Sequence, residues 1–339
     1  MAKPENNEVW DGILAGLPPT PSPKDQIPLP EILRVIQYCL KDGVEQYDAA
    51  IDLLEPLSKL RNDIEFLNWK AMVEYDAKKY IRSFATTQKI LEYAKDAGSY
   101  FNAGRAAYKA NELQLSKEYL QKAMDLDPGN SSYILDYAVT VCTMGDFDGA
   151  LKIIESIDKS KLDDMHAKIV DFNKGWHYVR LGKFKEGMAL INIGRTINVW
   201  GSDSRRWKKP RWDGENQPGK TILIAGEGGI GDEVINARFG KLIKKRGMNV
   251  IMSTVHKNTS MLSSVPGIDK VIDDKDIDNT EFDYWIPCMD VPFALGISEK
   301  DIPSNPYLKA KPEYVEKWKK KIDGQGLKIG IRWMGNPRY

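Results

Sequence analysis

The chain has 339 residues and almost balanced charge, with 49 Lys and Arg against 48 Asp and Glu. This length exceeds that of a typical single domain and predicts two folding units. Balanced charge leaves no global field for nucleic acid or an anionic membrane, which argues against nucleic acid as a partner. A polar N-terminus and the lack of a long apolar run predict a cytoplasmic protein with no membrane span.

The three cysteines, Cys39, Cys142 and Cys288, lie in apolar segments, and none is near another Cys or a His at metal-ligand spacing. They are interpreted as reduced core thiols. We therefore expect no metal site and no bound cofactor.

Residues 1–30 form a proline-rich leader, which includes the run PPTPSPKDQIPLP from Pro18 to Pro30. This proline density prevents a helix and predicts a flexible, extended segment.

A small residue recurs through residues 31–200 at intervals of 33, 33, 34 and 37 positions. The recurring residues are Ala50, Ser83, Ser116, Ala150 and Gly187. This spacing is typical of tetratricopeptide repeats and predicts an α-solenoid of about five helix pairs. Twelve positions earlier, four of the five repeats again carry a small residue, at Ala71, Gly104, Ala138 and Gly175; Tyr38 is the exception. These positions predict close approach of paired helices.

The first helix of each repeat faces the concave side of such a solenoid. Its sixth position carries Trp69, Asn102, Asp136 and Asn173 in the last four repeats. An Asn side chain there can donate to and accept from the backbone of an extended peptide. The sequence thus allows a peptide-binding groove, and it equally allows ordinary solvated polar positions.

Residues 201–219 lose apolar periodicity and predict a linker. The segment contains a basic and aromatic cluster from Arg205 to Trp212 that could bind nucleic acid or a phosphate. Docking of its tryptophans onto the flanking domains is the favoured interpretation.

Residues 220–339 predict a Rossmann-like parallel α/β domain. Strand 221–225 is followed by a glycine-rich turn, a helix to about Arg246 and strand 249–255. Further strands are expected near 270–272, 283–286 and 328–333, with a helix over 313–322.

The turn spells G-x-G-x-x-G at Gly226, Gly228 and Gly231, the dinucleotide fingerprint. No carboxylate ends the second strand to bind a ribose, which argues against NAD. Asp232 lies in the first helical turn, where the helix dipole favours its ionised form. It can act as a general base for a hydroxyl, or it can simply cap the helix.

Several stretches together resemble tetratricopeptide-containing glycosyltransferase-like proteins, which are related to heptosyltransferases and more loosely to O-GlcNAc transferases. These stretches include PRWDGENQPGKTILIAGEGGIGDEVINARF, FDYWIPCMDVPFALG and LKIGIRWMGNPRY, in family order. The resemblance implies the acceptor-side, N-terminal half of a metal-independent GT-B fold. A nucleotide-sugar would be the donor, and a protein or glycan hydroxyl the acceptor.

The resemblance also implies site residues. Asp232 matches the position of the presumed base. The acceptor side would be formed by Glu227, Gly228, Gly229, Gly231 and Arg238. The cleft floor would be lined by Arg332, Trp333 and Asn336.

In the resembling proteins a second Rossmann-like half follows, whereas the given sequence ends at Tyr339. We expect either a fragment or a truncated homologue. Two functional hypotheses therefore stand: a glycosyltransferase whose repeats recruit the acceptor or a partner, and a non-catalytic binding or assembly protein with a vestigial half-domain.

Overall fold

The computed structural model describes residues 34, 36–37, 39, 46–58, 62–199, 208–255, 258–322 and 324–331. Its contacts divide the chain into two compact units, Met1–Lys159 and Ser160–Tyr339. The division lies upstream of the linker predicted at 201–219. The last helix pair therefore belongs to the same unit as the sheet. The predicted leader, 1–30, lies outside the described residues.

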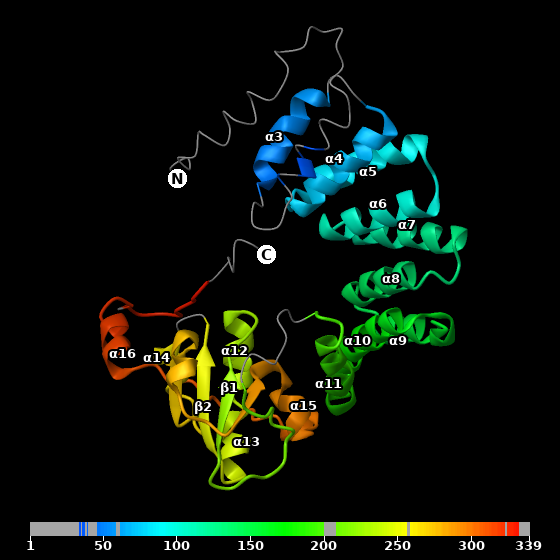
Figure 1. Cartoon of the computed structure of the whole chain (residues 1–339). Coiled ribbons are helices and arrows are strands. Elements are labelled where there is room, and N and C mark those ends of the chain that lie inside the picture. The colour runs from blue at the N-terminus through cyan, green and yellow to red at the C-terminus, as the bar shows by residue number, and fades with distance from the viewer. Residues whose placement is uncertain are drawn as a thin grey trace. The chain divides into compact units, whose positions relative to one another are not determined.

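The first unit is a series of helices that pack in sequential pairs (Figure 1). Its helices are α3 (Tyr47–Leu57), α4 (Ile64–Asp76), α5 (Tyr80–Tyr93), α6 (Ala97–Lys109), α7 (Leu113–Leu126), α8 (Ser131–Thr143) and α9 (Phe147–Glu155). The second unit opens with a further pair, α10 (Asp164–Arg180) and α11 (Phe184–Asn192). The predicted helical solenoid of tetratricopeptide type is confirmed.

An Asp or Asn side chain caps the first helix of each described pair from α4 onward. Asp63, Asp96, Asn130 and Asp163 accept a hydrogen bond from a backbone N–H in the first turn of α4, α6, α8 and α10. Such a residue satisfies a backbone donor that has no partner within the helix. The capping residues follow the repeat spacing, so each repeat starts its first helix in the same way.

The small residues of the repeat lie where paired helices touch. The hydroxyl of Ser83 in α5 donates to the carbonyl of Ala71 in α4 at 2.8 Å. A Cβ atom on Gly104 would lie 2.6 Å from Cγ of Leu120, and one on Gly175 would lie 2.9 Å from the carbonyl oxygen of Gly187. The predicted close approach is therefore observed.

The second unit also contains a four-stranded parallel sheet in the order β3-β2-β1-β4. The strands are β1 (Thr221–Ala225), β2 (Asn249–Thr254), β3 (Lys270–Asp273) and β4 (Tyr284–Pro287). Between and after them lie α12 (Ile230–Ala237), α13 (Gly240–Lys245), α14 (Thr259–Leu262), α15 (Val291–Leu295) and α16 (Pro312–Lys319). The inner strand β1 has β2 on one side and β4 on the other, so the sheet is a small parallel layer with crossovers to both sides.

Side chains of β1 alternate between two buried layers. Ile222 and Ile224 pack in a core with Phe239, Ile243 and neighbouring groups, whereas Leu223 packs on the opposite face with Trp285. A strand buried on both faces reads as a continuous apolar run, which explains TILIA. In Figure 1, α12 and α13 lie against β1 and β2.

Three sequence predictions differ from this structure. The predicted helix to Arg246 is two helices, because Phe239 N bonds to Asn236 O three residues back and interrupts the α-helical ladder. Residues 328–331, the described part of the predicted last strand, form no strand, and Ile329 and Ile331 are exposed. The described end of the predicted linker, 208–219, is ordered on the sheet: the side chain of Trp212 is buried, and the backbone N–H of Trp212 donates to Trp285 O at 2.8 Å. This confirms tryptophan docking for Trp212.

Candidate functional site

The first candidate site is a cavity of about 490 Å³ in the helical repeats, hereafter the repeat cavity. Its walls are formed by α4 and α6 and its floor by α5. The lining side chains are Glu65, Asn68, Trp69, Ala71, Met72, Tyr75, Asp76, Ser83, Thr87, Ile90, Asn102 and Arg105. Two predicted groove residues, Trp69 and Asn102, are among them. Ala71 of α4 and Ser83 of α5 are small and buried, so these two helices approach closely at the base of the cavity.

The other two predicted groove residues have internal partners. Asp136 lies 3.5 Å from Nε of Arg105, a residue of the cavity wall. Burial raises the pKa of Asp136, although Arg105 and Lys109 act in the opposite direction. Asn173 belongs to the second unit, and its amide donates to the carbonyl of Ile169 at 2.8 Å. The structure therefore links Asp136 to the cavity, and one amide donor of Asn173 is used within α10.

Arg105 is held in place by aromatic rings as well as by Asp136. Its guanidinium carbon lies 5.2 Å from the ring centre of Tyr75 and 5.6 Å from that of Phe101. Stacking of this kind orients a cation without removing all of its donors. Sequence analysis did not select Arg105 because it lies three positions after Asn102, outside the sixth-position series.

The second candidate site is the glycine-rich turn after β1. Gly226 N donates to Ser253 Oγ at 3.0 Å, and a Cβ there would lie 2.6 Å from the carbonyl oxygen of Ser253. Gly228 has a φ of 72°, in the left-handed region that glycine adopts without strain. A Cβ on Gly231 would meet nothing within 4 Å. Two of the three fingerprint glycines are thus required by the turn itself.

Asp232 caps the helix that follows this turn. Its Oδ2 accepts a hydrogen bond from Gly229 N at 2.7 Å, and the backbone N–H of Asp232 in turn bonds to the carbonyl of Gly229. Of the two interpretations of Asp232, the structure shows the capping contact. Its role as a base stays a prediction.

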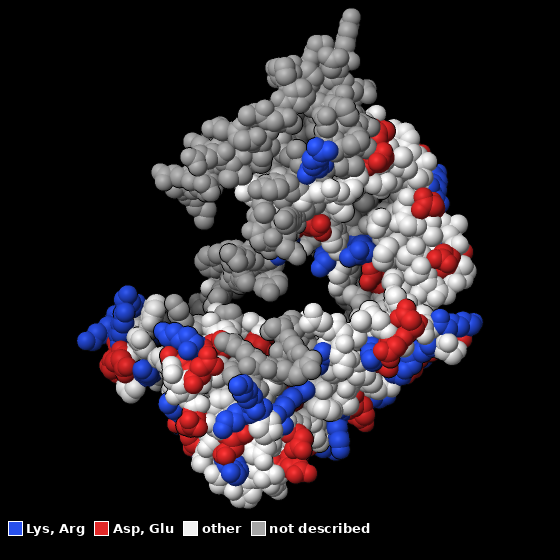
Figure 2. All heavy atoms as spheres, viewed as in Figure 1, with Lys and Arg blue, Asp and Glu red and all other residues white. Residues whose placement is uncertain are grey.

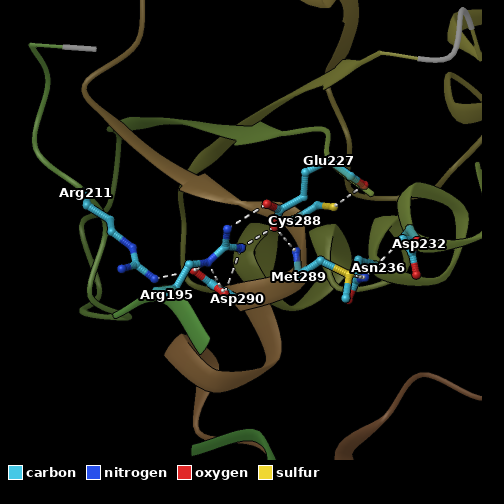
Figure 3. Close-up of polar contacts among 8 residues, drawn as sticks. All are labelled: Arg195, Arg211, Glu227, Asp232, Asn236, Cys288, Met289 and Asp290. Carbon is cyan, nitrogen blue, oxygen red and sulfur yellow. Dashed lines mark hydrogen bonds and ion pairs between the residues drawn. The ribbon is translucent and has the colours of Figure 1, made fainter. Parts of the chain in front are cut away.

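Glu227 belongs to a charged network on the other side of the turn (Figure 3). Arg195, in the 3-10 turn Ile193–Arg195, donates to both Glu227 and Asp290. Arg211 also pairs with Asp290. Glu227 further accepts from Met289 N at 3.2 Å. Two guanidinium groups therefore neutralise two carboxylates, and Glu227 serves as a structural link.

A third carboxylate at the turn, Glu233, was not selected from the sequence. It is fully buried and accepts from Thr254 Oγ1 at 2.6 Å, Val255 N at 2.8 Å and Asn258 Nδ2 at 3.3 Å. It fastens α12 to the end of β2. The sequence feature that could have identified Glu233 is its place one residue after Asp232, which puts the two carboxylates on different faces of the helix.

The remaining predicted residues lie apart from the turn or outside the described structure. Arg238, just after α12, donates to the Tyr307 hydroxyl at 3.1 Å. Arg332, Trp333 and Asn336 lie outside the described residues. Cys288 is buried beside Glu227, and burial raises the pKa of its thiol, as expected for a core cysteine.

Within the described ranges, no group of three or more His, Cys, Asp or Glu side chains could hold a metal ion. Across the same residues, every helix is too short or too polar to cross a bilayer. Figure 2 shows Lys and Arg interspersed with Asp and Glu over the described surface in this view, in keeping with the balanced composition.

The described geometry defines a helical-repeat protein of tetratricopeptide type with a small parallel α/β layer. The chain is 22% identical over 349 aligned positions to protein FlbA of Caulobacter vibrioides. That alignment covers 86% of this chain and 57% of FlbA, so the chain spans little more than half of its relative. No protein-family model matches the chain.

Solved structures similar to the chain include repeat proteins. One is the crystal structure of MamA, which is 19% identical in sequence. Its alignment covers 48% of this chain and 94% of the MamA chain, with a TM-score of 0.39. Another is YrrB, described as a tetratricopeptide protein with an unusual peptide-binding site, which is 15% identical in sequence. Its alignment covers 51% of this chain and 86% of the YrrB chain, with a TM-score of 0.37.

Proposed function

We propose that the chain is a non-catalytic binding or assembly protein whose repeat cavity holds an extended peptide segment of a partner protein. The observation that carries this proposal is the repeat cavity itself, which combines aromatic walls with side-chain amides. Trp69, Met72 and Tyr75 offer apolar surface, and large aromatic side chains dominate the energy of many interfaces. Asn68 and Asn102 can pair with the N–H and C=O groups of a bound backbone.

The charges of the repeat cavity indicate the kind of peptide. Its lining contains two carboxylates, Glu65 and Asp76, and one cation, Arg105, which already lies beside Asp136. The excess of carboxylates favours a peptide that places Lys or Arg next to an apolar side chain. Like charges would repel an acidic peptide, which gives the cavity selectivity as well as affinity.

Sugar transfer, the other hypothesis, receives little support from the contacts of the glycine-rich turn. Asp232 already accepts from Gly229 N, and Glu227 is paired with Arg195. A nucleotide-sugar donor and a glycan acceptor stay hypotheses. Release of free nucleotide from a panel of nucleotide-sugars by the whole chain, lost in Asp232→Asn, would support them.

Peptide selection tests the proposed function. A randomised library of displayed 12-residue peptides is selected on the immobilised whole chain, and enriched sequences are synthesised with a fluorescent label. We expect an apolar residue next to Lys or Arg in the enriched set. Trp69→Ala and Asn102→Ala should each weaken binding about tenfold, because each removes a central contact.

The matched control is Gln88→Ala, which also truncates an exposed amide but lies on α5 outside the cavity lining. It should bind like the unchanged chain. Failure to enrich any peptide, or equal binding by all three variants, would overturn the proposal. Replacing the basic residue of a selected peptide by Glu should abolish binding.

A further inference from the structure

A second cavity, of about 180 Å³, lies beside α13 in the unit that contains the sheet. We call it the basic cavity. Its lining includes Arg238, Lys241 and Lys245 from the helical segment, and Asp301, Asn305 and Tyr307 from the loop opposite. Lys241 and Lys245 are four residues apart on α13 and share one face of that helix, and Arg238 lies just before the helix begins. Pro266, Pro303 and Pro306 complete the wall with residues of restricted backbone freedom.

The cations of this face are not compensated by the fold. Among the described residues, Lys241 and Lys245 form no ion pair, whereas Lys244, on the adjacent face, pairs with Asp269 at 2.7 Å. Like charges four residues apart on a helix repel each other and destabilise it. The arrangement costs the free protein stability, and an anion in the cavity would remove that cost.

Arg238 is positioned before any ligand arrives. Its Nη2 donates to the Tyr307 hydroxyl at 3.1 Å, and its guanidinium carbon lies 4.8 Å from the centre of the Tyr307 ring. The hydroxyl in turn donates to Val234 O at 2.9 Å. A guanidinium fixed in this way loses less entropy when it binds an anion.

One carboxylate, Asp301, faces the same cavity. Hydrogen bonds from the backbone and side chain of Ser298, at 2.9 and 2.7 Å, lower the pKa of Asp301, and Lys185 acts in the same direction. Asp301 is therefore ionised at neutral pH and is directed toward Ser298. Three cations against one carboxylate leave the basic cavity net positive.

We propose that the basic cavity binds the phosphate group of a small phosphate ester. Its volume corresponds to about six water molecules in the liquid, enough for one phosphate group. Drug-sized ligands need about 300 Å³ or more, so a whole nucleotide would extend outside it. The cavity is separate from the glycine-rich turn, because the eight residues of α12 span about 12 Å between them.

Titration with inorganic phosphate and with glycerol 3-phosphate tests this proposal, by calorimetry on the whole chain at constant ionic strength. The double variant Lys241→Gln/Lys245→Gln should bind each at least tenfold more weakly, because charge-assisted hydrogen bonds are lost. Asp301→Asn should bind inorganic phosphate more tightly, because it removes the one repelling charge. Lys244→Gln is the matched control and should bind like the unchanged chain.

Equal affinity of the double variant and Lys244→Gln would overturn the proposal, as would a failure of either phosphate compound to bind the unchanged chain. Thermal melts confirm that each variant is folded. A separate arm measures sedimentation with vesicles of phosphatidic acid in phosphatidylcholine. Binding to these vesicles without binding to the free phosphate compounds would identify a lipid headgroup as the ligand and would also overturn the proposal.

Discussion

Arg195 donates through Nη1 to Glu227 Oε2 at 2.8 Å, which joins the turn after α11 to the glycine-rich turn after β1. The same guanidinium donates to Asp290, after β4 (Figure 3). Phe184 of α11 also packs against the core of the sheet. The last helix pair is thus fastened to the α/β layer through both charge and apolar contact, and Arg195 links it to the glycine-rich turn.

Removal of this link should destabilise the second unit. Arg195→Ala leaves Asp290 and Glu227 with less compensation, and Asp290 has only 4% of its side chain exposed. Loss of one partner of a largely buried pair costs about 3 kcal/mol in the free energy of unfolding. Urea denaturation followed by tryptophan fluorescence measures this change.

A double-mutant cycle separates the Arg195 contacts. If Glu227 contributes to the link, Arg195→Ala and Glu227→Gln together should destabilise by less than the sum of the two single changes. Exact additivity would contradict a direct coupling between the two side chains.

Asp232→Ala should lower stability by about 1 kcal/mol, because the variant loses the hydrogen bond to Gly229 N at the start of α12. Asp232→Ser should recover part of the loss, since a Ser hydroxyl can also accept from the backbone. Thermal denaturation of the two variants measures this order. A variant as stable as the unchanged chain would contradict the capping role.

Two glycines of the second unit should respond to alanine in opposite directions. In Gly175→Ala the new Cβ would lie 2.9 Å from both the Gly187 carbonyl oxygen and Ile191 N, so α10 and α11 must separate. We expect a loss of about 2 kcal/mol. In Gly231→Ala the Cβ meets nothing within 4 Å, and the lower backbone entropy of the unfolded chain should stabilise by about 0.5 kcal/mol. Denaturant melts of both variants test the sign of each change.

The stability of the second unit should depend on Asp283 in acid. The N–H of Thr221 and the ammonium of Lys220 bond to this carboxylate, and they lower its pKa from the usual 3.8. A lowered pKa in the folded state contributes stability that is complete above pH 3.8 and is lost as pH falls through the folded value. Asp283→Asn should therefore flatten the pH dependence of unfolding below about pH 4. The exposed Asp278→Asn is the control, and an equal effect of both would contradict the assignment.

The helical repeat and the order of the first strand, turn and helix of the sheet unit follow from patterns in the sequence. Intervals of 33 and 34 residues between small side chains predict paired helices, because only a small residue lets two helix backbones approach, as Ala71 and Ser83 do. The apolar run at 221–225 and the glycine-rich turn after it predict β1 and the start of α12 at their observed places, although the predicted helix to Arg246 is divided into α12 and α13. Periodic and local patterns carry this information because their causes lie within a few residues.

The polar groups that already have hydrogen-bond or ion-pair partners could be identified only from the folded chain. Glu227 reads as a site residue, yet Arg195, 32 positions earlier in the chain, neutralises it. Arg238 reads as part of the same turn, yet its guanidinium donates to the hydroxyl of Tyr307, 69 positions later in the chain. Pairing of charges depends on which elements the fold brings together, and a sequence pattern of period three or four contains no record of such distant neighbours.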